Sequence, residues 1–204
     1  MTVAALAAVA LHQLLPGDFR LSPHWIFPAF MVVFLLVLIV GDPGRIDRQR
    51  RWLQITTVLM IGLITMTNAF SAARLVAGIM TKGKSFDTAG QLLQIGAIVF
   101  LTNVIAFALW YWALDGGGAA ARAARGPGHR AGFVFPEMTV PELVPGGWYP
   151  QFIDYFALSF NTATAFGPTD VAAIRPWAKL MMITEASISL ALATLVVARA
   201  VNIL

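Results

Sequence analysis

The residues best suited to chemistry in this chain lie together in one polar stretch, Asn-Thr-Ala-Thr-Ala-Phe-Gly-Pro-Thr-Asp, at positions 161–170. An aromatic and apolar segment precedes it at 152–160, and a long apolar segment follows at 177–201. A short helix, a polar turn and a long membrane helix follow one another in this order in a re-entrant pore loop. Backbone that is not helical is tolerated at membrane depth only where it is buried in protein or lines a water-filled cavity. The stretch is therefore a candidate for lining a pore.

A simpler interpretation of the same stretch stays open. Thr169 and Asp170 are residue types that cap the first turn of a helix, because their side-chain oxygens accept hydrogen bonds from free backbone N–H groups. The stretch would then be an ordinary loop between two helices, closed by a Pro-Thr-Asp turn before the next one.

A carboxyl group, Glu185, lies inside the apolar segment that follows the polar stretch. A carboxylate within a membrane is costly unless it is paired or hydrated. Three roles are open for it: Glu185 can hold the back of the preceding loop, bind a cation or take up a proton. Ser189, one turn further on, can hydrate the same face or bond to a carbonyl of its own helix. Asn68 and Asn103 interrupt two other apolar segments, and we expect them to form hydrogen bonds between helices.

Several kinds of site are not expected. The chain has no cysteine, which removes disulfides, thiol chemistry and Cys-based metal sites. No group of His, Asp and Glu has the spacing of a metal site, and no Ser, His and Asp set presents itself for an intramembrane enzyme. His12 is the one histidine that falls in a predicted helix, where a haem or pigment would bind. We expect neither enzymatic activity nor a resident cofactor or metal.

The composition is that of an integral membrane protein. Of the 204 residues, 58% are hydrophobic and 12% are charged, and the mean hydropathy is +0.75. A soluble domain carries roughly twice that charged fraction. The formal net charge is +4, and the basic residues lie in connections near the ends of the apolar segments. This placement favours lipid headgroups over nucleic acid as the partner of the basic residues.

The hydropathy pattern predicts an all-α membrane protein with four transmembrane helices, a short N-terminal helix and one re-entrant helix-loop. The four long apolar segments lie at 25–40, 53–80, 91–114 and 177–201. The apolar run at 4–10 is not preceded by Lys or Arg, so we expect a short helix there rather than a signal peptide.

Two further features concern the ends of these segments. The connection 115–150 is rich in Gly, Pro and Ala, and we expect most of it to be irregular. Trp110, Tyr111 and Trp112 close the third apolar segment, and we expect them in an aromatic belt at a membrane surface.

Residues 154–203 resemble the pore module of the two-helix bacterial potassium channels. Asp-Tyr-Phe-Ala-Leu-Ser-Phe at 154–160 resembles their pore helix, and 162–170 falls where they carry a Thr- and Gly-rich selectivity filter. Their inner helix is matched by Arg-Pro-Trp-Ala-Lys at 175–179, Glu-Ala at 185–186 and Ala-Arg at 198–199. The whole chain is also similar to a group of bacterial membrane proteins with related Thr-Ala-Phe-x-Pro-Thr-Asp and Ala-Arg-Ala-Val-Asn-Ile-Leu stretches, a similarity that implies no activity.

The channel resemblance implies two parts: an N-terminal segment of one short helix and two spans at 1–90, and a pore-like module at 91–204. Within the module it implies an outer helix at 91–114, a turret at 115–150, a re-entrant helix-loop at 152–170 and an inner helix at 176–201. It further implies a homotetramer in a bacterial inner membrane, in which one loop from each chain surrounds a path for a monovalent cation.

The resemblance also assigns roles to residues. The filter-like residues are Thr162, Thr164, Ala165, Phe166, Gly167, Pro168, Thr169 and Asp170. Glu185 and Ser189 would support the loop from the inner helix, with Ser189 where the channels have a hinge glycine.

Three filter positions depart from the channel pattern. Ala165 stands in place of a threonine, Pro168 in place of the tyrosine and Thr169 in place of the second glycine. Carbonyls that all point inward require glycine-favoured dihedral angles, whereas proline fixes its own φ and biases the residue before it toward extended backbone. We therefore expect altered or weak potassium selectivity.

Three interpretations of function follow. The leading one is a tetrameric cation-channel-like protein. The alternative is a non-conducting structural or accessory subunit of a larger membrane complex, and the third, a pigment- or haem-binding subunit, depends on His12. Orientation is open as well, because the channel resemblance places the connection near residue 45 outside, whereas the positive-inside rule places its arginines in the cytoplasm.

Overall fold

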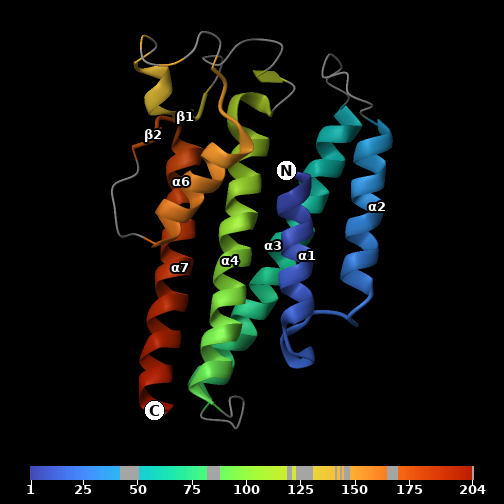
Figure 1. Cartoon of the computed structure of the whole chain (residues 1–204), viewed down its shortest axis with the longest axis vertical. Helices are drawn as coiled ribbons and strands as arrows, with labels where there is room; N and C mark the ends of the chain where they lie inside the picture. Colours follow the sequence, from blue (N-terminus) through green and yellow to red (C-terminus); the bar gives the residue numbers. More distant parts are fainter. Residues whose placement is uncertain are drawn as a thin grey trace.

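The computed structural model describes residues 1–41, 51–81, 88–118, 121–122, 131–140, 142, 144, 148–164 and 170–203. This part of the chain is mostly helical (Figure 1). In chain order its elements are α1 (Thr2–Leu14), η1 (Gly17–Phe19), α2 (Ile26–Gly41), α3 (Arg51–Met80), α4 (Ala89–Leu114), η2 (Asp115–Gly117), β1 (Phe133–Val134), η3 (Pro136–Met138), α6 (Phe152–Thr164), β2 (Ala172–Ala173) and α7 (Pro176–Ile203).

Three helices, α3, α4 and α7, are long and apolar enough to cross a membrane. They have 30, 26 and 28 residues, in agreement with the prediction of an all-α membrane protein. The predicted span at 25–40 folds as α2, which has 16 residues, and the predicted N-terminal helix folds as α1, which has 13. Both are shorter than the roughly 20 residues of an ordinary span.

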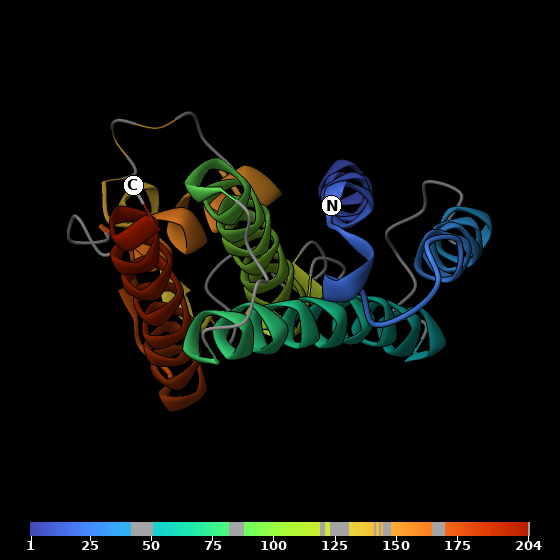
Figure 2. The same ribbon diagram turned by 90° about the horizontal axis from the view of Figure 1, so that it is seen from below.

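Helix α4 lies at the centre of the bundle. Helices α6 and α7 pack on one side of it, α1 lies on the other, and α3 crosses below them in the view of Figure 2. Within the most apolar 18-residue stretch of each long helix, 72% of α4 is buried inside the chain, against 33% of α3 and 22% of α7. Helices α3 and α7 therefore present most of their apolar surface outward, to lipid or to other chains.

The ends of α4 follow from its sequence. The hydroxyl oxygen of Thr88 accepts a hydrogen bond of 3.2 Å from the backbone N–H of Gln91 and so caps the first turn. At the other end Gly116, Gly117 and Gly118 take φ values of 58°, 85° and 91°. Glycine adopts this left-handed backbone without steric penalty, so the three glycines stop the helix and turn the chain.

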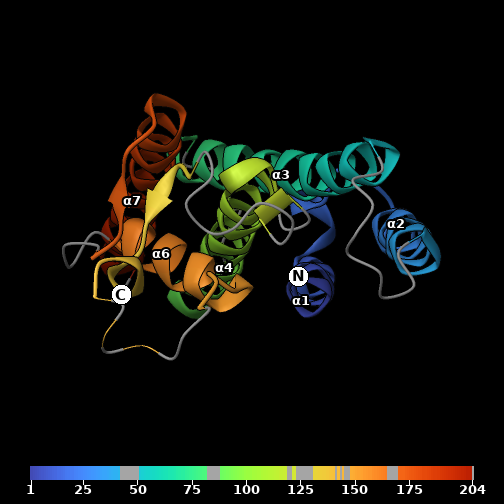
Figure 3. The ribbon, with the colours of Figure 1, turned by 90° about the horizontal axis from the view of Figure 1, so that it is seen from above.

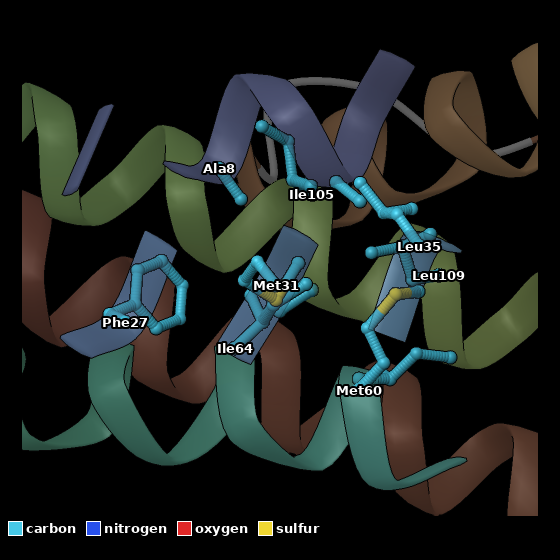
Figure 4. Close-up of a cluster of buried hydrophobic side chains, with 11 residues drawn as sticks. Ala8, Phe27, Met31, Leu35, Met60, Ile64, Ile105 and Leu109 are labelled. Atoms are coloured by element: carbon cyan, nitrogen blue, oxygen red, sulfur yellow. The ribbon is translucent and has the colours of Figure 1, made fainter. Parts of the chain in front are cut away.

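The interior consists of three clusters of buried apolar side chains. The first joins α1, α2, α3 and α4, and Figure 4 shows Met31 and Ile64 within it. The second lies where α3 and α4 meet the C-terminal half of α7, around Leu92. The third is aromatic and gathers Tyr111 and Tyr155 where α4, β1, α6 and α7 meet. This third cluster surrounds the candidate site.

Candidate functional site

Helix α6 lies obliquely across the upper parts of α4 and α7, as Figures 1 and 3 both show. Two hydroxyl side chains on α6, Tyr155 and Ser159, are fully buried. They are four residues apart, so they lie on the same face of the helix, one turn from each other. Each is hydrogen-bonded to a different buried carboxyl group, and these two groups hold α6 in place.

The first carboxyl group belongs to Asp115, the residue that follows α4. Its Oδ2 accepts a hydrogen bond of 2.6 Å from the hydroxyl of Tyr155, and its Oδ1 accepts one of 2.5 Å from the backbone N–H of Gly132. Asp115 is 1% exposed. Burial raises the pKa of the Tyr155 phenol, an effect that Arg122 opposes and the Asp115 carboxylate adds to. The phenol therefore keeps its proton and remains a donor to Asp115.

The guanidinium group of Arg122 completes this corner. One of its terminal nitrogens donates to the backbone carbonyls of Trp112, at 2.9 Å, and Asp115, at 2.5 Å. Trp112 lies in the last turn of α4, whose carbonyls have no further helical N–H groups to bond them. The Asp115 carbonyl just after the helix also accepts from the backbone N–H of Gly118, at 2.9 Å. The guanidinium carbon also lies 5.2 Å from the ring centroid of Tyr155 and 5.7 Å from that of Trp112. A positive charge is favourable both at a helix C-terminus and over an aromatic ring.

Phe133 packs into the centre of the third cluster. Its ring meets those of Tyr111, Tyr155 and Trp177 edge-on, with centroids 5.0, 6.4 and 5.6 Å away. The backbone of β1 pairs antiparallel with β2, with Phe133 opposite Ala173. This pairing ties the connection between α4 and α6 to the segment that leads into α7.

The second carboxyl group, Glu185 of α7, lies at the junction of three helices. The hydroxyl of Tyr111, from α4, donates to its Oε2, and a second hydrogen bond joins its Oε1 to the hydroxyl of Ser159, from α6. The Ser159 oxygen also lies 2.8 Å from the backbone carbonyl oxygen of Val104 on α4. Glu185, Tyr111 and Ser159 are each 0% exposed. Among the three sequence interpretations of Glu185, this geometry agrees with support of the segment that contains α6.

A line of polar side chains continues below Glu185. The amide nitrogen of Asn103 donates to the Ser189 hydroxyl at 3.1 Å, and the amide oxygen of Asn103 accepts from Asn68 at 3.5 Å. These residues belong to α4, α7 and α3, and all three are buried. The expected hydrogen bonds between helices are therefore present, and Ser189 joins α7 to α4.

The filter-like residues are only partly described. Ala165, Phe166, Gly167, Pro168 and Thr169 lie outside the described residues. The other three filter-like residues, Thr162, Thr164 and Asp170, are described, and they form no hydrogen bond with one another. Asp170 is exposed.

Both threonines bond to their own helix. The Thr162 hydroxyl is buried and donates to the carbonyl of Leu158, and the Thr164 hydroxyl lies 3.0 Å from the carbonyl of Phe160. Within one chain, the side chains of these residues therefore act on α6 itself.

Four residues of the site were not expected from the sequence: Asp115, Arg122, Tyr155 and Ser159. Tyr111 was expected in a surface belt, and this prediction was wrong, because its ring is fully buried. Successive helical residues are turned by about 100°, which brings Tyr111 inward. In the sequence, the one signal for Tyr155 and Ser159 was their four-residue spacing within the short apolar segment 152–160, which places both hydroxyls on one face of a helix.

The third interpretation, a pigment or haem on His12, stays a prediction. His12 is buried against the ring of Phe27, with centroids 4.5 Å apart. Among the described residues there is no group of three or more His, Cys, Asp or Glu side chains that could hold a metal ion.

Comparisons of the chain with protein families, with curated proteins and with solved structures found no match. The functional argument therefore depends on the residues and their geometry.

Proposed function

We propose that the chain is a channel-like membrane protein in which α4, α6 and α7 form one quarter of a cation-conducting pore with altered or weak potassium selectivity. The observation that carries the proposal is the placement of α6, a 13-residue helix held against both long helices through Tyr155 and Ser159. At 1.5 Å per residue such a helix is about 20 Å long, whereas the hydrocarbon core of a bilayer is about 30 Å thick. A helix of this length enters a membrane without crossing it.

The position of the next elements supports a re-entrant path. In Figure 1, β2 and the start of α7 lie at the same end of the bundle as the start of α6. The chain would therefore enter the membrane as α6 and leave it on the same side. Residues 165–169, between α6 and Asp170, lie outside the described residues.

The C-terminal end of α6 is suited to a cation. The last carbonyls of a helix have no helical partners and carry partial negative charge. Asn161 is exposed there, and Thr164 is half-buried. In the proposed pore, the backbone of 165–169 together with Thr164 would line the narrow part, and Asp170 would shape the mouth. The sequence also suggested a lining role for Thr162, but its side chain is buried within the chain. Glu185 would hold the loop from behind.

One chain supplies one such loop, so a central pore requires about four chains, as in the potassium channels that the sequence resembles. Four copies would pack in a bacterial inner membrane through the outward surface of α7, of which little is buried within the chain. Helix α2 would be the fourth span, with the bilayer thinned or its flanking residues extended to match its 16 residues.

The departures from the filter pattern favour a second candidate function, a non-conducting structural subunit of a larger membrane complex. Pro168 and Thr169 replace residues that shape the cation cage in potassium channels. In this case the α6 arrangement would be kept as a scaffold for contact with other subunits.

The native mass of the gently solubilised protein separates the two candidates. A homotetramer is expected for the channel, and thallium flux into proteoliposomes then measures conduction. A monomer, or one copy bound to foreign subunits, would contradict a central pore and favour the structural subunit.

The roles of the site residues are tested by Asp170→Asn and Glu185→Ala in the same flux assay, because alanine removes the partner of both the Tyr111 and the Ser159 hydroxyls. The matched control is Asp18→Asn. Asp18 is exposed in η1, and its backbone contacts Arg74 on α3, so it lies outside the candidate site. If both site variants leave a measured flux unchanged, the roles assigned to Asp170 and Glu185 fail.

A further inference from the structure

We propose that Glu185 is a proton-binding site: its carboxyl group is neutral in this structure, and loss of its proton releases α6 from α4 and α7. The proposal starts from the number of protons available at the junction of the three helices. It concerns the chain by itself, and only its consequence for conduction rests on the proposed function.

The hydrogen bonds around Glu185 require three protons. One contact joins Tyr111 to Oε2, one joins Ser159 to Oε1, and one joins Ser159 to the backbone carbonyl of Val104. A phenol and a serine hydroxyl carry one proton each, and a carbonyl carries none. If Oε1 is protonated, it donates to Ser159, Ser159 donates to Val104, and Tyr111 donates to Oε2. Every contact then holds one proton.

An ionised Glu185 leaves the junction one proton short. Ser159 would have to donate either to Glu185 or to the carbonyl of Val104, and the remaining pair of oxygens would face each other without a proton. The negative charge would also be buried, because Glu185 and both hydroxyl partners are 0% exposed. Burying a charge without an ionic partner is strongly unfavourable, whereas a neutral carboxylic acid with its hydrogen bonds made is tolerated.

Among the described residues, the groups that face Glu185 include no positively charged side chain. From α4 the facing group is the phenol of Tyr111, and from α6 it is the hydroxyl of Ser159. From α7 itself the next buried polar group is Ser189, which is bonded to Asn103. The segment 165–169, outside the described residues, contains only Ala, Phe, Gly, Pro and Thr, so it has no ionisable side chain.

The charged side chains described on the surrounding elements bond to other groups, lie on the surface or lie near the far end of α7, so they are not partners of Glu185. Arg122 donates to the backbone carbonyl of Asp115, and both residues contact Tyr155 at the start of α6. Arg74 on α3 donates to the backbone of Asp18. Arg175, just before α7, and Lys179, on α7, are exposed. Arg199 is half-buried and lies further along α7, near its C-terminal end.

The consequence of ionisation is mechanical. Ser159 links α6 to α4 through Val104 and to α7 through Glu185. When Glu185 loses its proton, Ser159 keeps one of these links at most, and the new charge favours water in the junction. Helix α6 then opens away from the two long helices. In the proposed channel, α6 positions the filter-like loop, so conduction would fall as the pH rises.

Glu185→Gln is the matched variant for a test. A glutamine amide donates through its nitrogen to Ser159 and accepts through its oxygen from Tyr111, as the neutral acid does, but it has no proton to lose. Asp154→Asn is the control. Asp154 also lies on α6, and burial raises the pKa of its carboxyl group, so it is an acid on α6 itself that could make the helix sensitive to pH.

Two measurements on the full chain in lipid nanodiscs test the proposal. Infrared spectroscopy is expected to show a protonated-carboxyl carbonyl band at neutral pH in the wild type and in Asp154→Asn, and not in Glu185→Gln. Backbone hydrogen exchange of 152–164 is compared between variants at each pH. Over the pH range in which Glu185 is neutral in the closed form and ionised in the open form, opening of α6 releases one proton. The equilibrium constant for opening in the wild type then rises about tenfold per pH unit relative to Glu185→Gln.

The outcomes that overturn the proposal differ from those that overturn the proposed function. If the protonated-carboxyl band at neutral pH persists in Glu185→Gln, or is absent from the wild type, the claim that Glu185 is neutral is contradicted. If the backbone hydrogen exchange of α6 is equal in the wild type and Glu185→Gln at every pH, the claim that ionisation releases α6 is contradicted. Neither readout requires conduction, so a protein without flux can still bear the proposal out.

Discussion

The hydroxyl of Tyr155 donates a hydrogen bond of 2.6 Å to Oδ2 of Asp115, a residue 40 positions earlier in the chain. This bond fixes the first turn of α6 to the end of α4. One turn further along α6, Ser159 makes the corresponding contact with Glu185 of α7. The short helix is therefore held by two buried carboxyl groups, one directly after α4 and one on α7.

Tyr155→Phe is expected to destabilise the fold by about 1–3 kcal/mol, because it leaves one oxygen of buried Asp115 without its donor. Denaturant unfolding in detergent micelles, followed by circular dichroism, measures the change. The control is Tyr149→Phe at a residue that is 44% exposed, where the same substitution is expected to have little effect. Equal effects of the two substitutions would contradict the role of the bond.

Arg122→Lys is expected to lower the free energy of unfolding by about 1.5–3 kcal/mol, although the charge is conserved. A lysine ammonium lacks the planar guanidinium that bonds two carbonyls at the end of α4 and lies over two rings. The same unfolding assay applies, with Arg51→Lys at an exposed position as its control. An unchanged stability would mean that charge alone suffices at this corner.

Gly132→Ala is expected to destabilise the fold by about 1–3 kcal/mol through overpacking. A Cβ at this position would lie 2.3 Å from Cζ2 of Trp177, so the indole ring would have to move. The variant Trp177→Phe removes the clashing atoms, and a double-mutant cycle is expected to show that it relieves the effect of the alanine. Gly62→Ala serves as control, since nothing lies within 4 Å of its added Cβ. Additive effects at 132 and 177 would rule out the clash.

Gly96→Ala is expected to separate α4 from α7. Its Cβ would lie 2.8 Å from Cγ1 of Val196, at a point where a small residue permits close approach of the two helices. We expect a loss of about 1–3 kcal/mol, relieved when Val196→Ala is combined with it. Gly90→Ala on the same helix, with its nearest neighbour 3.9 Å away, is expected to be tolerated. If Val196→Ala gives no relief, the contact between α4 and α7 is not the cause.

Glu185→Ala is expected to be much less stable than Glu185→Gln. Alanine leaves a cavity and removes the partner of two buried hydroxyls, those of Tyr111 and Ser159, whereas glutamine keeps both hydrogen bonds. The difference is expected to be about 2–4 kcal/mol in unfolding measurements at neutral pH. Similar stability of the two variants would show that the junction does not depend on these bonds.

The helices were predictable because a membrane imposes a simple rule on the sequence. Apolar runs long enough to span it must be helical, since their backbone groups have no water to bond. The segments at 53–80, 91–114 and 177–201 became α3, α4 and α7 on this basis. The segment at 25–40 became the shorter α2. Apolarity shows that a helix forms, but it does not determine how far the helix reaches past its apolar core.

The site was predictable only in part. Glu185 was singled out because a carboxyl group in an apolar helix requires a partner, but the sequence did not name the partner. Tyr111 and Ser159 are 74 and 26 residues away, and no spacing rule connects positions so distant. Arg122 lies in a connection that was expected to be irregular, and its burial follows from the carbonyls and rings that it meets.

Residue types and their local spacing were enough to predict a helical, apolar chain, polar partners for Glu185, Asn68 and Asn103, and 161–170 as the candidate functional stretch. The folded chain was needed to show which helix lies at the centre, which hydroxyls meet which carboxyl groups, and that α6 is held between α4 and α7. Side-chain contacts between distant segments depend on how the helices pack, and packing is decided by the whole set of buried surfaces at once.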